Sequence, residues 1–354
     1  MSRAHPDRRT ATAALAGALW APASWCQTAA RAAPWHADRL ALLEAQLRAN
    51  PNIRALLMER HGAAFTHYRA DTTPTTRANV ASITKTVVSL LVGIAIGRGL
   101  IANVDEPLAA FFTEHAQGPH AATLQRVTLR HLLTLTPGFE RSGLDENSDY
   151  MAFTQRFYGQ GLLQYALGRR IAEAPGTKFY YSNIDVHLVA MALARRLKVP
   201  FAEFVREALF QPLGIGTVEW PASSDGIPNG ASELRLSAAE LMRLGRLMLD
   251  GGRWEGRQVV PQQYLREATT RQVASDVTPR GPAALWGYGY LIWLASTPGD
   301  NLPAFYAAGY GGQFIYVVPA LELVVVATTD QVSRQVAAQT AAIIRDFAVP
   351  AVTR

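Results

Sequence analysis

The spacing of apolar and polar residues predicts a helix followed by a β-hairpin at the start of the folded chain. Leucines recur at helical intervals over residues 38–49, and this pattern stops before Pro51. Two strand-like runs, 53–59 and 63–69, flank a turn-forming segment at 60–62. The hairpin supplies the first two strands that we expect in the fold.

The patterning is mostly helical through the middle of the chain and strand-like towards its end. A long apolar helix is predicted from Ser82 to about Arg98, closed by Gly99, and helical spacing dominates from about 128 to 250. After about residue 285, four segments are rich in β-branched and aromatic residues and are separated by turn residues: 286–294, 305–310, 313–319 and 321–329. A closing helix is predicted over 333–347.

The order of these elements predicts an α/β (α+β) fold with a central antiparallel sheet flanked by helices. Both ends of the chain supply strands, and the mostly helical block is a large insertion between them. The chain has 354 residues, of which 49% are hydrophobic, and this is enough to bury a sizeable core. We expect residues 34–354 to form one domain.

Residues 1–33 have the parts of a secretory signal peptide. Arg8 and Arg9 precede an apolar, alanine-rich run at 10–25, and small residues follow at 29–33. The paired arginines suggest twin-arginine export, and an alanine-rich tail without a targeting role is the alternative. We therefore expect a periplasmic or secreted protein. Its single cysteine, Cys26, lies inside this segment, so the mature chain would have no disulfide.

The charge of the chain argues against a nucleic-acid partner. The formal net charge is +6, but the first 33 residues hold four arginines and one aspartate, so only +3 remains for the rest. No basic stripe interleaved with aromatic residues is present. The apolar run at 86–96 is too short to span a membrane, and we expect no stable membrane anchor. The sequence leaves the oligomeric state open.

The first group of candidate catalytic residues is Ser82-Ile83-Thr84-Lys85, at the start of the long apolar helix. A serine is a weak nucleophile until a neighbouring group takes its proton. Positions i and i+3 share one face of a helix, so Lys85 can reach the Ser82 hydroxyl. The apolar helix would bury Lys85 and favour its neutral form. The alternative is that Ser82 simply caps the helix.

Two further motifs carry residues suited to acyl transfer. Tyr181-Ser182-Asn183 precedes a helix, and a tyrosine beside a lysine can act as a base or proton relay; a buried tyrosine pair with a helix cap is the alternative. The segment 309–313 includes the pair Gly311-Gly312 on a predicted strand, where backbone N–H groups could stabilise an oxyanion. A bulge or tight turn is the alternative there.

Together the three motifs follow the order and rough separations found in the serine β-lactamase and penicillin-binding protein superfamily. The chain resembles the class C β-lactamase-related branch, which also holds esterases, D-amino-acid peptidases and 6-aminohexanoate-dimer hydrolases. Further stretches that look like this branch are 128–138, 209–214, 236–241 and 309–319. The resemblance covers roughly residues 40 to 348 and implies a β-lactamase/transpeptidase-like fold.

The resemblance implies that Ser82 is the acylated nucleophile and that Lys85 and Tyr181 share its proton. The backbone N–H groups of Ser82 and Gln313 would form the oxyanion hole. The residues implied in substrate or oxyanion binding are Asn183, Tyr310, Gly311, Gly312 and Gln313. The expected function is hydrolysis of a small-molecule amide or ester through an acyl-enzyme on Ser82.

Some features leave the substrate open. True β-lactamases have K-T-G where this chain has Tyr310-Gly311-Gly312, so no cation is placed there to bind a β-lactam carboxylate. We hypothesise that a loop at 139–150 overhangs the site and that Asp145 and Asp149 bind a cationic substrate amine; a solvated loop is the alternative. Short-chain esters, linear amides, D-peptides and β-lactams all fit the same chemistry.

Other classes of protein remain as alternatives. A β-lactamase or a D-peptidase of the penicillin-binding type would use the same residues. A non-catalytic peptidoglycan- or ligand-binding sensor could have the same fold. A Ser-His-Asp hydrolase is disfavoured because no G-x-S-x-G segment is present, and the scattered histidines lack metal-binding spacing. No metal and no cofactor are expected.

Overall fold

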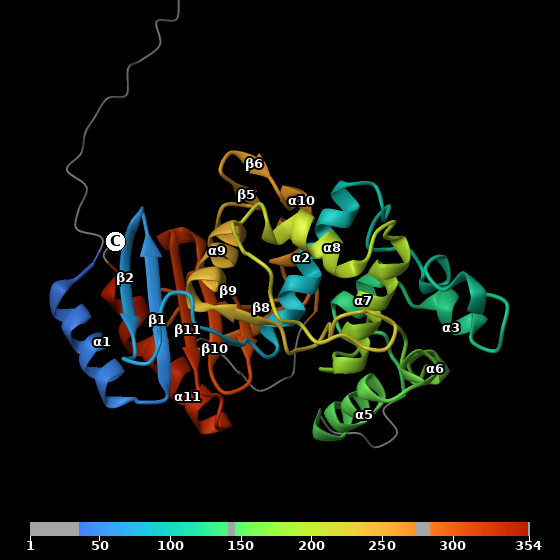
Figure 1. Cartoon of the computed structure of the whole chain (residues 1–354), viewed down its shortest axis with the longest axis horizontal. Helices are drawn as coiled ribbons and strands as arrows, with labels where there is room; N and C mark the ends of the chain where they lie inside the picture. The colour runs from blue at the N-terminus through green and yellow to red at the C-terminus, as the bar shows by residue number, and fades with distance from the viewer. Residues whose placement is uncertain (1–34, 141–145, 274–283, 353–354) are drawn as a thin grey trace, which may run out of the picture. The chain divides into compact units, whose positions relative to one another are not determined.

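A seven-stranded antiparallel sheet lies at the centre of the computed structural model, which describes residues 35–140, 146–273 and 284–352 (Figure 1). Within these ranges, the strand order is β2-β1-β11-β10-β9-β8-β7. The strands are β1 Ile53–Arg60, β2 Ala63–Tyr68, β7 Ala284–Tyr288, β8 Trp293–Ser296, β9 Pro303–Gly309, β10 Gln313–Val318 and β11 Leu323–Thr329. Strand β1 pairs with β11, so the predicted sheet built from both chain ends is confirmed.

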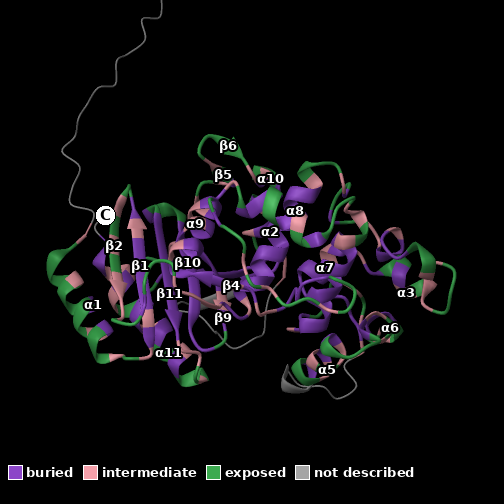
Figure 2. Cartoon of the chain, viewed as in Figure 1, coloured by how far each residue is buried: buried purple, intermediate pink, exposed green. Residues whose placement is uncertain are grey.

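The middle of the sheet is buried on both faces. Every residue of β10 and β11 is buried (Figure 2). Because successive side chains on a strand point to opposite faces, both faces of these two strands are covered. Helix α9 (Ala238–Leu249) packs against both strands. It approaches so closely that a Cβ atom at Gly245 would lie 2.5 Å from the Val324 side chain. The sheet is therefore a core layer that can hold loops rigidly at its ends.

Helices dominate the chain between β2 and β7, as predicted. They are α2 Ile83–Gly97, α3 Ala121–Arg126, α4 Leu129–Leu133, α5 Glu146–Tyr158, α6 Leu162–Gly168, α7 Asn183–Arg196, α8 Phe201–Val205, α9 and α10 Gln262–Ala268. Helix α1 (Ala37–Ala49) precedes the sheet strands and α11 (Arg334–Ile343) follows them. Two short sheets pair β3 (Arg77–Asn79) with β4 (Arg235–Ser237), and β5 (Arg253–Trp254) with β6 (Arg257–Gln258).

One predicted detail differs from the structure. The single strand expected at 286–294 is two strands, β7 and β8, because the chain turns between them; Leu291 has a φ of +55°. A Cβ atom at Gly289 in that turn would lie 1.9 Å from the Ala268 carbonyl oxygen, so only glycine fits. The segment before Tyr181 is irregular, and α7 begins at Asn183, so the predicted helix after this motif is present.

The predicted signal peptide, residues 1–33, and Asp145 lie outside the described residues. Of the helices in the described ranges, none combines the length and the apolar character that crossing a membrane requires.

Candidate active site

Ser82 lies in the tight turn between β3 and α2. The residue before it, Ala81, has a left-handed φ of +48°, a conformation that costs a non-glycine residue about 1–3 kcal/mol. Two contacts hold it: Asn79 Oδ1 accepts the Ala81 N–H at 2.7 Å, and Thr84 Oγ1 donates to the Ala81 carbonyl at 2.6 Å. The strained turn is thus fixed and presents Ser82 at the first turn of α2.

The Ser82 hydroxyl does not cap the helix that it begins. Its φ of −70° and ψ of −3° are helical, and its side chain makes no capping hydrogen bond. Instead, Lys85 Nζ donates to Ser82 Oγ at 3.0 Å. The two side chains predicted to meet from adjacent turns of one helix do so, and the capping alternative for Ser82 is not what the structure has.

Lys85 is 2% exposed and has an acceptor for each proton of an ammonium group. Its Nζ donates to Ser82 Oγ at 3.0 Å, to Asn183 Oδ1 at 2.8 Å and to the Ala231 carbonyl at 2.7 Å. A buried charge is costly unless its donors are paired. The three contacts therefore make a charged Lys85 tolerable in this buried position.

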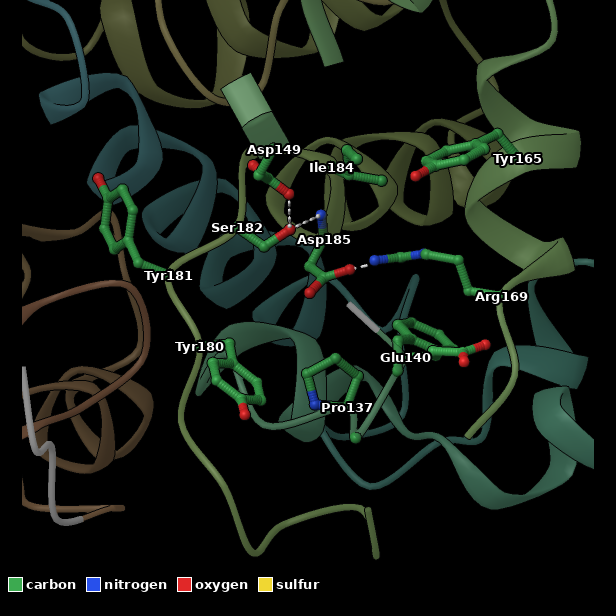
Figure 3. A pocket seen from close by; sticks show the side chains of 12 residues that line it. Pro137, Glu140, Asp149, Tyr165, Arg169, Tyr180, Tyr181, Ser182, Ile184 and Asp185 are labelled. Carbon is green, nitrogen blue, oxygen red and sulfur yellow. Dashed lines mark hydrogen bonds and ion pairs between the residues drawn. The ribbon is translucent and has the colours of Figure 1, made fainter. Parts of the chain in front are cut away.

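Tyr181 lies beside Lys85, with the Lys85 Nζ 4.9 Å from the centre of its ring. The ring stacks on Trp293 of β8, with centroids 5.7 Å apart and planes 15° apart. In Figure 3, Tyr181 extends to the opposite side of the chain from Tyr165 and Arg169. The stack fixes the phenol ring near the lysine.

Asp149 of α5 contacts the last two residues of the second motif, Ser182 and Asn183, and its contact with Ser182 is drawn in Figure 3. It is 6% exposed; its carboxylate accepts the Ser182 hydroxyl at 2.9 Å and the Asn183 backbone N–H at 2.7 Å. Asn183 Nδ2 also donates to it, at 3.3 Å. An ionised carboxylate only accepts hydrogen bonds, so it turns the Asn183 amide with its oxygen towards Lys85.

The hypothesis that Asp149 binds a substrate amine from a loop over the site is therefore wrong. Its carboxylate is buried and occupied by Ser182 and Asn183. Burial raises the pKa of Asp149, and the hydrogen bond from the Asn183 backbone opposes this rise. The residue supports the site from within the fold.

The glycine-containing third motif packs directly on the turn that carries Ser82. A Cβ atom at Gly309 would lie 2.3 Å from the Val80 carbonyl oxygen. Gly311 and Gly312 have φ values of +78° and +107°, and the Gly312 N–H donates to the Gly309 carbonyl at 3.2 Å. These conformations and contacts require glycine. Tyr310, at the tip of this turn, is 53% exposed.

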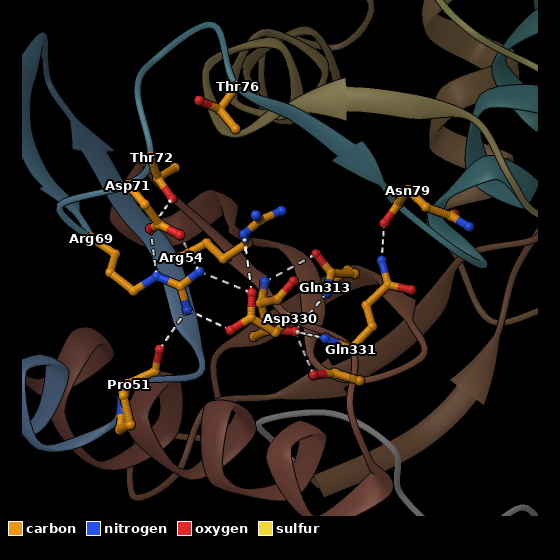
Figure 4. A network of polar contacts seen from close by, with 12 residues as sticks. Pro51, Arg54, Arg69, Asp71, Thr72, Thr76, Asn79, Gln313, Asp330 and Gln331 are labelled. Carbon is orange, nitrogen blue, oxygen red and sulfur yellow. Dashed lines mark hydrogen bonds and ion pairs between the residues drawn. The ribbon is translucent and has the colours of Figure 1, made fainter.

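Polar contacts tie this motif to the Ser82 turn (Figure 4). The side chain of Gln313 is buried, and its Nε2 donates to Thr329 Oγ1 at 2.7 Å. Thr329 Oγ1 donates in turn to the Gly311 carbonyl at 2.6 Å. Gln331 Nε2 donates to the carbonyl of Asn79, two residues before Ala81. Because its side chain is occupied, any role for Gln313 at an oxyanion falls to its backbone N–H.

The structure brings the three sequence motifs together and adds residues that the sequence did not indicate. Asn183 contacts Lys85 directly, Tyr181 lies beside it, and Gly309 lies against the Ser82 turn. Gly311 and Gly312 lie in the turn between β9 and β10, not on a strand as expected. The additions are Asp149 in its supporting position and the carbonyl of Ala231. In the described ranges, no group of three or more His, Cys, Asp or Glu residues is placed to hold a metal.

A serine and a lysine on one helix, a tyrosine and a glycine-containing turn thus lie together at one end of the sheet. The chain belongs to the Beta-lactamase family, which matches residues 41–349. The resemblance predicted from the sequence is thereby confirmed.

Individual relatives include hydrolases of amides. The chain is 23% identical over 308 residues to the 6-aminohexanoate-dimer hydrolase of Paenarthrobacter ureafaciens, covering 82% of this chain and 75% of that protein. The solved structure of EstCE1, a hydrolase with promiscuous acyltransferase activity, is similar, with a TM-score of 0.67, 17% identity and coverage of 87% and 98%. A D-stereospecific amidohydrolase from Streptomyces sp. has a TM-score of 0.61, 18% identity and coverage of 87% and 99%.

Proposed function

We propose that this chain is a serine hydrolase that cleaves an amide or ester bond through an acyl-enzyme on Ser82. The observation that carries the proposal is the 3.0 Å contact between Lys85 Nζ and a Ser82 hydroxyl that is not used as a helix cap. Membership of the Beta-lactamase family supports the reaction class, as do relatives named as an amidohydrolase and an acyl-transferring hydrolase.

In the proposed first step, Ser82 Oγ attacks the carbonyl carbon of the substrate and loses its proton. Lys85 as an ammonium already has an acceptor for each of its three protons, so we assign the first proton to the Tyr181 oxygen. The charged Lys85 beside the ring would stabilise a phenolate. The N–H groups of residues 83, 84 and 85 donate within the turn, which leaves the Ser82 N–H for the oxyanion, with that of Gln313.

The second half of the reaction reverses the proton path. The tetrahedral intermediate collapses, the carbon–nitrogen or carbon–oxygen bond breaks, and the amine or alcohol leaves with the proton held by Tyr181. Water then attacks the acyl group on Ser82, gives its proton to the Tyr181–Lys85 pair and releases the acid. Ser82 regains its proton, so that the cycle closes without a cofactor.

We propose an open-chain amide or ester as the substrate in preference to a β-lactam. Tyr310 is the exposed residue at the tip of the third motif, where true β-lactamases have the lysine of K-T-G. A β-lactamase or D-peptidase activity is the second candidate, supported by the shared residues Ser82, Lys85 and Tyr181. A non-catalytic ligand-binding role is the candidate from another class.

A substrate panel tests these candidates. Nitrophenyl esters, D-peptides, aminohexanoate oligomers and nitrocefin are assayed with the native chain and with Ser82→Ala. We expect turnover of an ester or linear amide that requires Ser82. Faster turnover of nitrocefin would favour a β-lactamase, and binding of a panel member without turnover would favour the sensor.

We also propose that the protein is exported to the periplasm or the medium, on the basis of the charged and apolar pattern of residues 1–33. The N-terminal sequence of the mature protein tests this, because export by cleavage removes that segment. A mature protein that begins at Met1 or Ser2 would contradict it.

A further inference from the structure

His187 of α7 is a buried histidine outside the set of residues that the proposed reaction uses. It lies one helical turn after Asn183 and is 1% exposed. Phe153 and Phe157 of α5 pack around it, with ring centroids 5.6 and 5.3 Å from its own. Its Nδ1 accepts the Gly230 N–H at 3.2 Å. Such a burial site needs a reason beyond packing, because an apolar side chain would fill it at lower cost.

The protonation state of His187 follows from this contact. Nδ1 accepts a hydrogen bond, so a neutral ring carries its proton on Nε2. Burial lowers the pKa of His187 to about 3, so the ring is neutral. Its Nε2 has no hydrogen-bond partner among the described residues. An unpaired buried N–H is costly, and the contact of Nδ1 is the compensating feature that the structure offers.

Gly230, the hydrogen-bond partner of His187, is next in sequence to a residue that contacts Lys85. Gly230 precedes Ala231, whose carbonyl accepts from Lys85 Nζ at 2.7 Å. Gly230 lies so close to α7 that a Cβ atom on it would be 2.9 Å from the Ala190 Cβ and 3.3 Å from the His187 Cα. The backbone at Gly230 therefore lies against α7, where the imidazole accepts its N–H, one residue before the carbonyl that contacts Lys85.

A second contact fixes the residues that follow Gly230. Asn229 Oδ1 accepts the N–H groups of Ala231 and Ser232 at 3.0 and 3.1 Å. Asn229 is itself buried. Helix α7 thus supports two of the three acceptors of Lys85: Asn183 contacts the ammonium directly, and His187 acts through the backbone that runs from the Gly230 N–H to the Ala231 carbonyl.

We propose that His187 is a positioning residue that holds the Ala231 carbonyl against Lys85 and thereby keeps Lys85 Nζ aligned with Ser82 Oγ. The proposal rests on the proposed function, because alignment matters only if Ser82 and Lys85 carry out the reaction. Displacing a reacting group by about 1 Å can lower the rate on the order of 10²-fold. The expected effect of losing the imidazole acceptor is a loss in kcat of about 10–100-fold with KM little changed.

Three substitutions separate positioning from packing. His187→Asn places an amide oxygen near the position of Nδ1, His187→Gln places one near Nε2, and His187→Leu has no acceptor. With p-nitrophenyl acetate as the probe, we expect His187→Asn to keep most of kcat and the other two to lose it. Thermal unfolding of each variant reports the cost to stability, and the comparison of Asn with Gln decides the matter if the leucine variant fails to fold.

Tyr316→Phe is the matched control. The Tyr316 hydroxyl is another buried polar atom with no hydrogen-bond partner among the described residues, and it lies on β10. Its removal alters a buried ring without touching the contacts of Lys85, so kcat should not change. A kcat that is equal in the Asn and Gln variants, or a loss that falls on KM, would overturn the positioning role. Turnover that survives Ser82→Ala would instead overturn the proposed function.

Discussion

Helices α2 and α9 leave the two strands of one small sheet, and each begins at a serine, yet the two serines are used differently. Strand β3 pairs with β4, and α2 and α9 follow them in the chain. Ser237 Oγ accepts the Glu240 N–H at 3.2 Å, and the Glu240 carboxylate accepts the Ser237 N–H at 2.9 Å. Ser82 makes no such cap and contacts Lys85.

The residue three positions on sets the difference. Glu240 has a carboxylate that can accept from the backbone, so the serine and the glutamate cap the helix reciprocally. Lys85 has only donors, and its ammonium takes the Ser82 oxygen as an acceptor. The backbone agrees: Ser237 is extended, with a ψ of 162°, whereas Ser82 is helical, with a ψ of −3°. The same residue type caps one helix and contacts a lysine at the start of the other.

The sharpest way to break this comparison is Ser82→Ala. We expect hydrolysis to fall to background, because the nucleophile is gone. Stability should fall by about 1–3 kcal/mol at most, because Lys85 loses one of its three acceptors while no cap is lost. Ester hydrolysis and urea unfolding measure the two quantities. Hydrolysis that survives in the folded variant would mean that Ser82 is not the nucleophile.

Tyr181→Phe tests the proposal that the Tyr181 oxygen accepts the proton of Ser82. We expect the rate to fall about 10²–10⁴-fold, as when a general base is removed. The stacking on Trp293 remains, so the fold should be unaffected. Steady-state kinetics with the same ester measure the loss. A rate reduction of less than about tenfold would mean that Tyr181 is not the base.

Asp149→Ala tests whether the buried Asp149 carboxylate orients the Asn183 amide towards Lys85. Without the carboxylate, the Asn183 amide can turn its nitrogen towards Lys85, and we expect kcat to fall by on the order of tenfold or more. Asp149→Asn is the matched variant, because it keeps the shape of the side chain. Unchanged kcat in the folded alanine variant would show that Asn183 needs no such orientation.

Acid should lower the free energy of unfolding through His187. The unfolded chain binds a proton at this histidine below pH 6.5, and the folded chain does so only near pH 3. Stability is therefore lost as the pH falls from about 6.5 to 3, by up to about 1.4 kcal/mol per pH unit. His187→Asn removes this contribution. Urea unfolding of both proteins at several pH values measures it, and identical pH slopes would contradict a neutral buried imidazole.

Ser237→Ala gives the smallest effect and completes the comparison. Loss of this cap should reduce the free energy of unfolding by about 0.5–2 kcal/mol. Catalysis should be unchanged, because Ser237 contacts Glu240 and not Lys85. Unfolding and ester hydrolysis are measured side by side with Ser82→Ala. A large loss of activity in the folded variant would remove the distinction between the two serines.

The features predicted correctly from the sequence are those with short-range signals. The cap of α9 is encoded by Ser237 and Glu240 three residues apart, and the serine–lysine pair at Ser82 has the same spacing. The strands that form the centre of the sheet show as β-branched runs. Of these strands, β11 pairs with β1, and this pairing covers the edge of a strand whose residues are all buried.

The supports of Lys85 could not be predicted because they arise from the fold. The sequence places Asp149 in a loop over the site, as a ligand for a substrate amine or as a solvated residue. Its burial depends instead on how α5 packs against α7. The carbonyl of Ala231 has no sequence signature, because every residue has a carbonyl. Only the three-dimensional structure selects the one that faces Lys85.

Covalent labelling of Ser82 tests the central claim most directly. The native chain is incubated with a fluorophosphonate, and intact mass and peptide mapping locate the adduct. We predict one adduct on Ser82 that is lost in Ser82→Ala and kept in Ser237→Ala. A folded protein that stays unlabelled, or one that is labelled on a different residue, would contradict the assignment of Ser82 as the nucleophile.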